Sequence, residues 1–152
     1  MKALREAIKD WYGHKPENEF DIVMDSTDFG DSYNPGGHCG WHTDILERFI
    51  RRPLLFKEWW QNFVREYTRV DPYKEVVRVL VCCPRGTKRA VAGAEILKYC
   101  VTSMGLIADK ANRHLSDDNW NNHLVLCSQC RLHTSQKRYR EVLERALQIA
   151  ET

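Results

Sequence analysis

Hydrophobic residues recur at the spacing of one helix face in five segments, and each of these segments predicts an amphipathic helix. The segments are residues 3–12, a stretch that begins near Thr43 and reaches Ile50, residues 56–67 after Pro53, residues 89–104, and residues 135–150. Thr43 is the expected N-cap of the second helix, and Gly105 suits the position just after the fourth. The third segment carries a stripe of large side chains that we interpret as core packing rather than a base-stacking platform: Phe56, Trp59, Trp60, Phe63, Val64 and Tyr67.

Two apolar runs have the length and composition of strands. Residues 20–24 form the first, and residues 76–81 form the second, which is rich in valine and interrupted only by Arg78. The second run is typical of a strand covered on both faces, as in a parallel sheet. Residues 106–108 are a third candidate strand. The order of these elements predicts one α/β domain over residues 1–152, a sandwich with a largely parallel central sheet and a helical C-terminal extension.

The bulk composition is that of a globular protein. The 152 residues are 43% hydrophobic and 29% charged, which suffices for one domain with a hydrophobic core. No stretch approaches the roughly 20 apolar residues of a membrane span, and the N-terminus has no apolar signal core. We therefore expect a cytoplasmic protein without a membrane partner, whose six cysteines are reduced thiols or metal ligands.

The net charge of +2 is unevenly divided along the chain. Residues 1–77 hold 11 Lys/Arg and 14 Asp/Glu (net −3), whereas residues 78–152 hold 12 and 7 (net +5). The basic half is where a phosphate-bearing partner should bind. The excess is too small to establish nucleic-acid binding, because a solvated face with a few extra lysines gives the same count.

The segment after the valine-rich run combines residue types that suit anion binding. Cys83, Gly86 and Arg89 follow the predicted strand at the spacing Cys-x-x-Gly-x-x-Arg, and a predicted helix begins at once. Free backbone N–H groups at a helix start attract an anion, glycine allows close approach, and an arginine fork matches two phosphate oxygens. The expected phosphate-binding residues are Cys83, Pro84, Arg85, Gly86, Thr87, Lys88 and Arg89. The alternative is a surface turn whose basic side chains face water.

Residues 20–115 resemble the C-terminal domain of the RNase adapter protein RapZ, whose loop reads Gly-Cys-Thr-Gly-Gly-x-His-Arg-Ser. The likeness rests on Phe20-Asp21 at a strand start, Cys39-Gly40-Trp41 before two helices, the helix sequence VAGAEIL at residues 91–97, and Arg113 with Leu115. The resemblance implies a non-catalytic module for a phosphorylated amino sugar such as glucosamine-6-phosphate, with RNA as a second ligand and Arg113 as a further positive group. A homo-oligomer is compatible with it. Residues 1–19 and the Cys/His segment and helix of residues 117–152 lie outside it.

Several positions depart from that family's pattern. Pro84 replaces the family threonine, which removes a hydroxyl and a backbone N–H donor. The other departures are Arg85 for glycine, Lys88 for histidine, Ala90 for serine and Asn112 for histidine. Cys83, Gly86 and Arg89 are retained, so the anion-binding chemistry is kept, whereas the identity of the ligand does not follow from the resemblance.

The same spacing occurs in cysteine-dependent phosphatases, whose signature is His-Cys-x-x-Gly-x-x-Arg followed by Ser or Thr. In this alternative, Cys83 is the nucleophile and Arg89 holds the phosphoryl group. Cys82 and Ala90 depart from the signature, because they replace its histidine and its hydroxyl residue. The general acid would be one of four aspartates: Asp25, Asp28, Asp31 or Asp44.

A second group of residues with metal-binding chemistry comprises His123, Cys127, Cys130 and His133. Thiolate and imidazole ligands suit Zn²⁺, and Cys-x-x-Cys is a common half-site. One helix would place all four on a single face, which cannot surround a tetrahedral ion. A zinc site therefore needs a turn at residues 127–130 and an outside ligand, for which Cys39, His38 and His42 are candidates. Ordinary thiols and histidines are the alternative, and an HNH-type nuclease is disfavoured because Lys110 occupies the place of its first metal-binding histidine.

Overall fold

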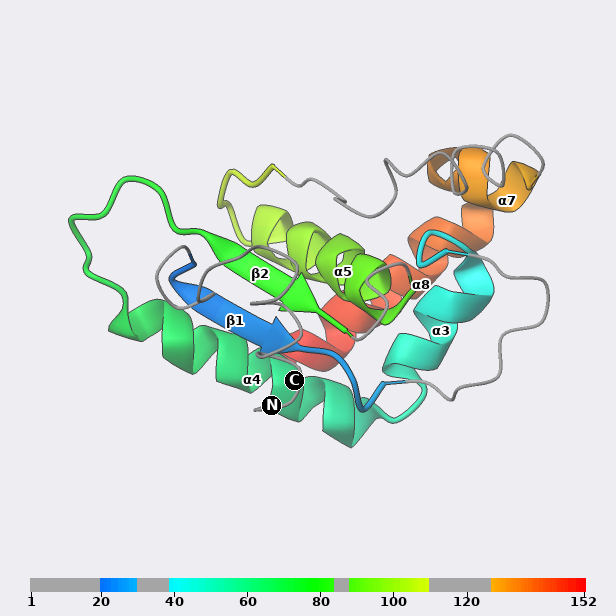
Figure 1. The fold of residues 1–152 in the computed structure, drawn as a ribbon. Coiled ribbons are helices and arrows are strands. Elements are labelled where there is room, and N and C mark those ends of the chain that lie inside the picture. Colours follow the sequence, from blue (N-terminus) through cyan, green and yellow to red (C-terminus); the bar gives the residue numbers. More distant parts are fainter. Residues whose placement is uncertain (1–19, 30–38, 84–87, 110–126) are drawn as a thin grey trace.

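The protein pairs two parallel strands and packs helices against them (Figure 1). A computed structural model describes residues 20–29, 39–83, 88–109 and 127–152. Strand β1 (Ile22–Asp25) pairs in parallel with β2 (Val79–Cys82), with Ile22 opposite Val79 and Asp25 opposite Cys82. The helices are α3 (Thr43–Ile50), α4 (Pro53–Arg69), α5 (Arg89–Ser103), α7 (Ser128–Arg131) and α8 (Lys137–Glu151), with a 3-10 turn η2 (His133–Ser135) before the last. The predicted mixed α/β class is confirmed, and the described part is mostly helical.

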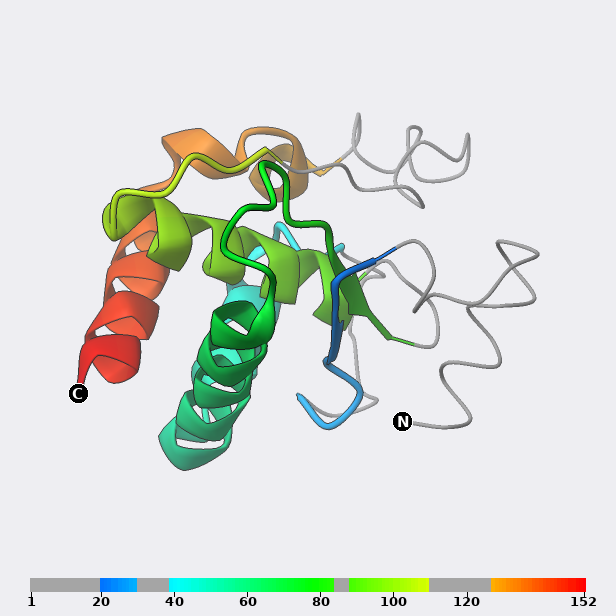
Figure 2. The ribbon, with the colours of Figure 1, turned by 90° about the vertical axis from the view of Figure 1, so that its left-hand side faces the viewer.

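The described helices cover one face of the two strands. Figure 2 shows α4, α5 and α8 on the same side of β1 and β2. Ile22 and Met24 of β1 are fully buried in the main core, and Val79 and Val81 of β2 pack against it. Leu80 and the other alternate side chains point to the opposite face, as the two-residue period of a strand requires. No described helix covers that face, so the doubly covered strand is not seen in the described part, and residues 76–78 precede β2 rather than belong to it.

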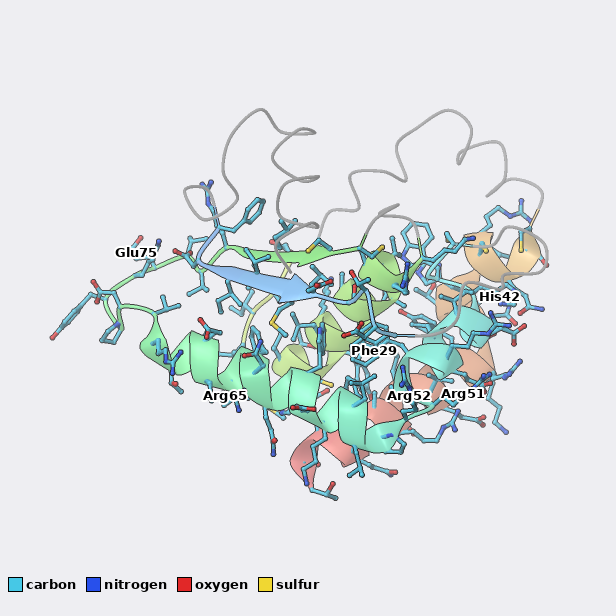
Figure 3. All side chains as sticks on the ribbon, turned by 60° about the horizontal axis from the view of Figure 1, so that its bottom comes forward. Phe29, His42, Arg51, Arg52, Arg65 and Glu75 are labelled. Carbon is cyan, nitrogen blue, oxygen red and sulfur yellow. The ribbon has the colours of Figure 1, made fainter. Side chains whose placement is uncertain are left out.

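An aromatic cluster forms the centre of the core. Phe49 of α3 stacks on Phe29 with ring centroids 4.1 Å apart, and it meets the edges of Trp59 at 5.2 Å and Phe56 at 6.2 Å. Figure 3 shows Phe29 between the end of β1 and the helices. The stripe on α4 is therefore core packing, as its spacing predicts. The buried face is narrower than expected, because the predicted members Val64 and Tyr67 are 41% and 37% exposed.

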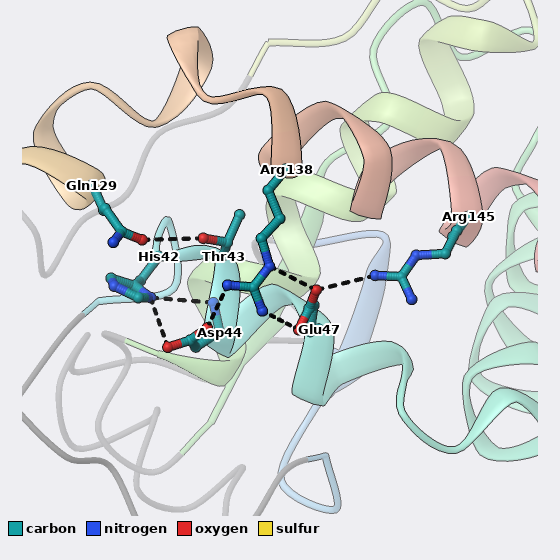
Figure 4. Close-up of polar contacts among 7 residues, drawn as sticks. All are labelled: His42, Thr43, Asp44, Glu47, Gln129, Arg138 and Arg145. Carbon is teal, nitrogen blue, oxygen red and sulfur yellow. Dashed lines mark hydrogen bonds and ion pairs between the residues drawn. The ribbon is translucent and has the colours of Figure 1, made fainter.

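Helix α8 is tied to α3 and α5 by polar contacts at the edge of the core. Arg138 donates from Nε to Oε1 of Glu47 at 2.9 Å, and Arg145 reaches the same oxygen at 3.2 Å (Figure 4). Tyr139 donates its hydroxyl to Oε2 of Glu95 at 2.5 Å. Burial, reinforced by the Glu95 carboxylate, raises the pKa of Tyr139, so its hydroxyl remains a donor in alkaline solution. The C-terminal helix predicted over residues 135–150 is confirmed.

Helix ends show how local sequence sets the boundaries. His42, not Thr43, caps α3: its Nδ1 accepts the N–H of Asp44 at 3.1 Å. Gly105, at φ +95°, ends α5 in a Schellman turn, in which it donates to the Thr102 carbonyl while Leu106 donates to Val101. The structure has no strand at residues 106–108, so that prediction is wrong. The helix predicted at residues 3–12 lies outside the described residues.

None of the described helices combines the length and the apolar character that crossing a membrane requires.

Candidate anion site at the strand ends

The carboxyl ends of β1 and β2 meet at one edge of the sheet, directly before the start of α5. Ser26, the first residue after β1, is fully buried, and both its N–H and its hydroxyl donate to the carbonyl of Cys82, at 2.9 Å and 2.8 Å. These bonds hold the exit of β1 against the exit of β2. In open parallel sheets this edge is where ligands bind, because helix N-termini point to it.

Cys83 lies in the turn that joins β2 to α5. Its side chain is only 2% exposed, and its sulfur accepts the backbone N–H of Ala90 at 3.3 Å. Cys83 therefore lies against the first turn of α5, so that Cys83 and Arg89 lie at the same helix end. The strand and the helix that the sequence predicts on either side of this segment are both present.

Arg89 is the first residue of α5, and its guanidinium is directed at the strand ends. Nη1 donates to the backbone carbonyl of Thr27, two residues beyond β1. Thr27 is itself fixed, since its N–H and hydroxyl both donate to Oδ1 of Asp25, at 2.9 Å and 2.5 Å. The guanidinium has five N–H donors, and one bond to a carbonyl leaves most of them for an anion.

The turn that contains Gly40 borders this site, in addition to the ends of β1 and β2. A Cβ at residue 40 would lie 2.2 Å from the Lys88 carbonyl oxygen and 2.4 Å from the Ala92 nitrogen, both of them backbone atoms at the start of α5. The turn of residues 39–42 can pack this closely only because residue 40 has no side chain. The N-terminus of α5 is thus bordered by β1, β2 and the residue 39–42 turn.

The structure describes only some of the predicted phosphate-binding residues. Pro84, Arg85, Gly86, Thr87 and Arg113 lie outside the described residues. Cys83 contacts the first turn of α5, where Lys88 is the N-cap residue and Arg89 the first helical residue. Ser26 and Thr27 were missed, although a polar run directly after a predicted parallel strand is a usable signal.

The four aspartates that are candidates for a general acid differ in where they lie relative to the strand ends. Asp25 ends β1 beside the site, and Asp28 follows nearby, where its carbonyl accepts from Arg52 at 2.6 Å. Asp44 is on α3 and pairs with Arg138 at 3.0 Å, away from the strand ends. Asp31 lies outside the described residues.

The predicted cysteine and histidine cluster is found at α7 and η2. Cys127 is the N-cap residue of α7, and Cys130 lies in that one-turn helix, so the segment makes the turn that a zinc site requires. The His133 ring stacks on Trp41 at 4.5 Å, and its Nδ1 lies 3.0 Å from the Cys130 carbonyl oxygen. His38 and His123 lie outside the described residues. Among the described residues, no group of three or more His, Cys, Asp or Glu side chains is arranged to hold a metal ion as it stands.

Comparison with family models, with curated proteins and with solved structures gives no match for this chain.

Proposed function

We propose that the chain is a non-catalytic binding module for a phosphorylated small molecule, built on a sandwich like that of the RapZ C-terminal domain. The observation that carries the proposal is the direction of Arg89, whose guanidinium bonds to the Thr27 carbonyl and so lies across the strand ends. A phosphate at this edge would meet the guanidinium fork and the amide end of a helix 15 residues long. The resemblance adds glucosamine-6-phosphate as the first ligand to test.

Arg89→Ala is expected to weaken phosphate binding by about 10- to 100-fold, since a hydrogen bond to a charged group contributes about 1.5–3 kcal/mol. Arg89→Lys should recover only part of the affinity, because lysine keeps the charge but lacks the planar fork. Isothermal titration calorimetry with glucosamine-6-phosphate, and separately with inorganic phosphate, measures both effects. The matched control is Arg69→Ala at the end of α4, where the arginine pairs with Glu66 at 3.1 Å.

If wild type, Arg89→Ala and Arg69→Ala bind phosphate with equal affinity, Arg89 is not part of the binding site. Equal losses in both alanine variants would show that general positive charge, rather than a located fork, attracts the anion. Thermal unfolding of each variant separates loss of ligand from loss of fold.

A cysteine-dependent phosphatase is the second candidate, favoured by the contact between the Cys83 sulfur and the Ala90 N–H and by Asp25 at the adjacent strand end. Against it stands the 2% exposure of Cys83, which leaves the sulfur little access to a substrate. We expect no turnover of p-nitrophenyl phosphate above background. Turnover that disappears in Cys83→Ser and in Asp25→Asn, but persists in Asp44→Asn, would establish the enzyme and overturn the binding module.

A further inference from the structure

Three cysteines from two segments that are distant in sequence pack together. Cys39 lies in the turn of residues 39–42, and Cys127 and Cys130 lie at α7. Cys39 and Cys130 are fully buried in one small cluster with Val91, and the half-buried Cys127 and Trp41 pack against it. The thiols of Cys39 and Cys130 form a hydrogen bond, and those of Cys127 and Cys130 form another. The chain thus gathers three cysteines in one cluster, with Cys130 between Cys39 and Cys127, although residues 39 and 127 are far apart in sequence.

Both segments that carry these cysteines are fixed turns. In the first, the His42 N–H donates to the Cys39 carbonyl at 3.1 Å, and in the second, the Arg131 N–H donates to the Cys127 carbonyl at 2.9 Å. The two are joined where the Thr43 hydroxyl donates to Oε1 of Gln129 at 3.3 Å (Figure 4). The sulfurs are therefore held together by the surrounding backbone and not only by their own contacts.

Backbone N–H groups point at the sulfurs from within each turn. Cys39 accepts from the N–H of Trp41, and Cys127 accepts from the N–H groups of Gln129 and Cys130. Hydrogen bonds of this kind favour the thiolate over the thiol. Thiols packed only as small apolar side chains do not need such donors.

We propose that Cys39, Cys127 and Cys130 bind one zinc ion through three thiolates. Three sulfurs on two turns surround an ion from different directions, which the single helix considered from the sequence could not do. Binding replaces the two sulfur–sulfur hydrogen bonds with three sulfur–zinc bonds, and each thiol gives up its proton to solvent. None of the described residues forms a ready-made metal site, so the cysteine side chains must shift to admit the ion.

The fourth position of a tetrahedral zinc is open to water or to another donor, and the two described histidines nearby differ in their suitability. Nδ1 of His42 accepts a backbone N–H, so the neutral ring carries its proton on Nε2 and is a poor ligand without losing the helix cap. Nδ1 of His133 faces a carbonyl oxygen, which can only accept, so the neutral ring has its lone pair on Nε2.

The test uses the whole chain, reduced and stripped of metal, and titrates it with zinc against a chromophoric chelator. One zinc per chain is expected for wild type, and less than a tenth of that for Cys39→Ala, Cys127→Ala and Cys130→Ala. The matched control is Cys100→Ala: Cys100 is also fully buried, but it packs in the main core. Cobalt substituted for zinc should give a sulfur-to-metal charge-transfer band in wild type that Cys127→Ala lacks.

Cys127 keeps the test falsifiable if the buried variants do not fold, because its side chain is only half buried. Zinc should raise the melting temperature of wild type and of Arg89→Ala, but not that of Cys127→Ala. Undiminished zinc affinity in a folded Cys127→Ala, equal loss in Cys100→Ala, or no binding by reduced wild type would each overturn the proposal. Since the expected zinc content of Arg89→Ala is that of wild type, the phosphate and zinc proposals fail independently.

Discussion

Phe49→Ala is expected to lower the free energy of unfolding by about 3–5 kcal/mol, because it leaves a cavity in the core that the neighbouring rings cannot fill. Phe49 is 1% exposed and contacts three other aromatic rings, those of Phe29, Phe56 and Trp59. The stack on Phe29 matters for the candidate anion site as well, since Phe29 fixes the segment that follows β1. Urea unfolding followed by tryptophan fluorescence measures the change.

The control for this variant is Tyr73→Ala, which removes an aromatic ring that is 92% exposed. A change within about 0.5 kcal/mol is expected there, as for most surface positions. A loss below about 1 kcal/mol for Phe49→Ala would mean that the ring does not occupy the centre of the core.

Gly40→Ala is expected to destabilise the fold by about 1–3 kcal/mol and to weaken phosphate binding in the same variant. The added methyl would overlap backbone atoms of Lys88 and Ala92, which no rotation of a side chain can relieve. The turn of residues 39–42 must therefore move away from the N-terminus of α5. Urea unfolding and phosphate calorimetry, run on one preparation, measure the two effects.

Gly105→Ala is the informative comparison for this variant. Nothing lies within 4 Å of a Cβ there, but φ is +95°, so the expected cost is backbone strain, on the order of 1–2 kcal/mol. That strain is at the far end of α5, and phosphate affinity should not change. Loss of stability in Gly40→Ala without loss of affinity would show that the close approach of the turn serves packing alone.

The helices could be predicted from the sequence because their buried faces follow a regular period. The face of α8 that carries Tyr139, Val142 and Leu143 is buried as its spacing indicates. The strand predicted at residues 106–108 is wrong, although an apolar triplet fits a strand. The backbone N–H of Leu106 instead bonds to the end of α5. The cap of α3 was assigned one residue too late, because the imidazole of His42 performs the role expected of the Thr43 hydroxyl.

Only those residues of the candidate anion site that lie close together in the sequence could be predicted. Cys83 and Arg89 are close together in the sequence, so their spacing is visible there. In the structure, both residues lie at the start of α5. The partners on other segments depend on how the chain folds back on itself. Thr27 meets Arg89 across 62 residues, and no periodicity encodes that contact. The sequence indicates Cys39 as a candidate outside ligand for zinc. Its contact with Cys130, however, arises only from the tertiary fold.

The parallel pairing of β1 with β2 has a consequence for how the molecule is made. Parallel strands cannot be joined by a tight turn, and here Ser26 bonds to Cys82, which lies 56 positions further along the chain. During synthesis, α3 and α4 emerge before β2, so β1 has no partner strand until residues 79–82 have been made. Closing that long loop is entropically costly and slow. The candidate anion site therefore cannot form until β2 and the start of α5 have both been made, and no fragment that stops short of α5 contains it.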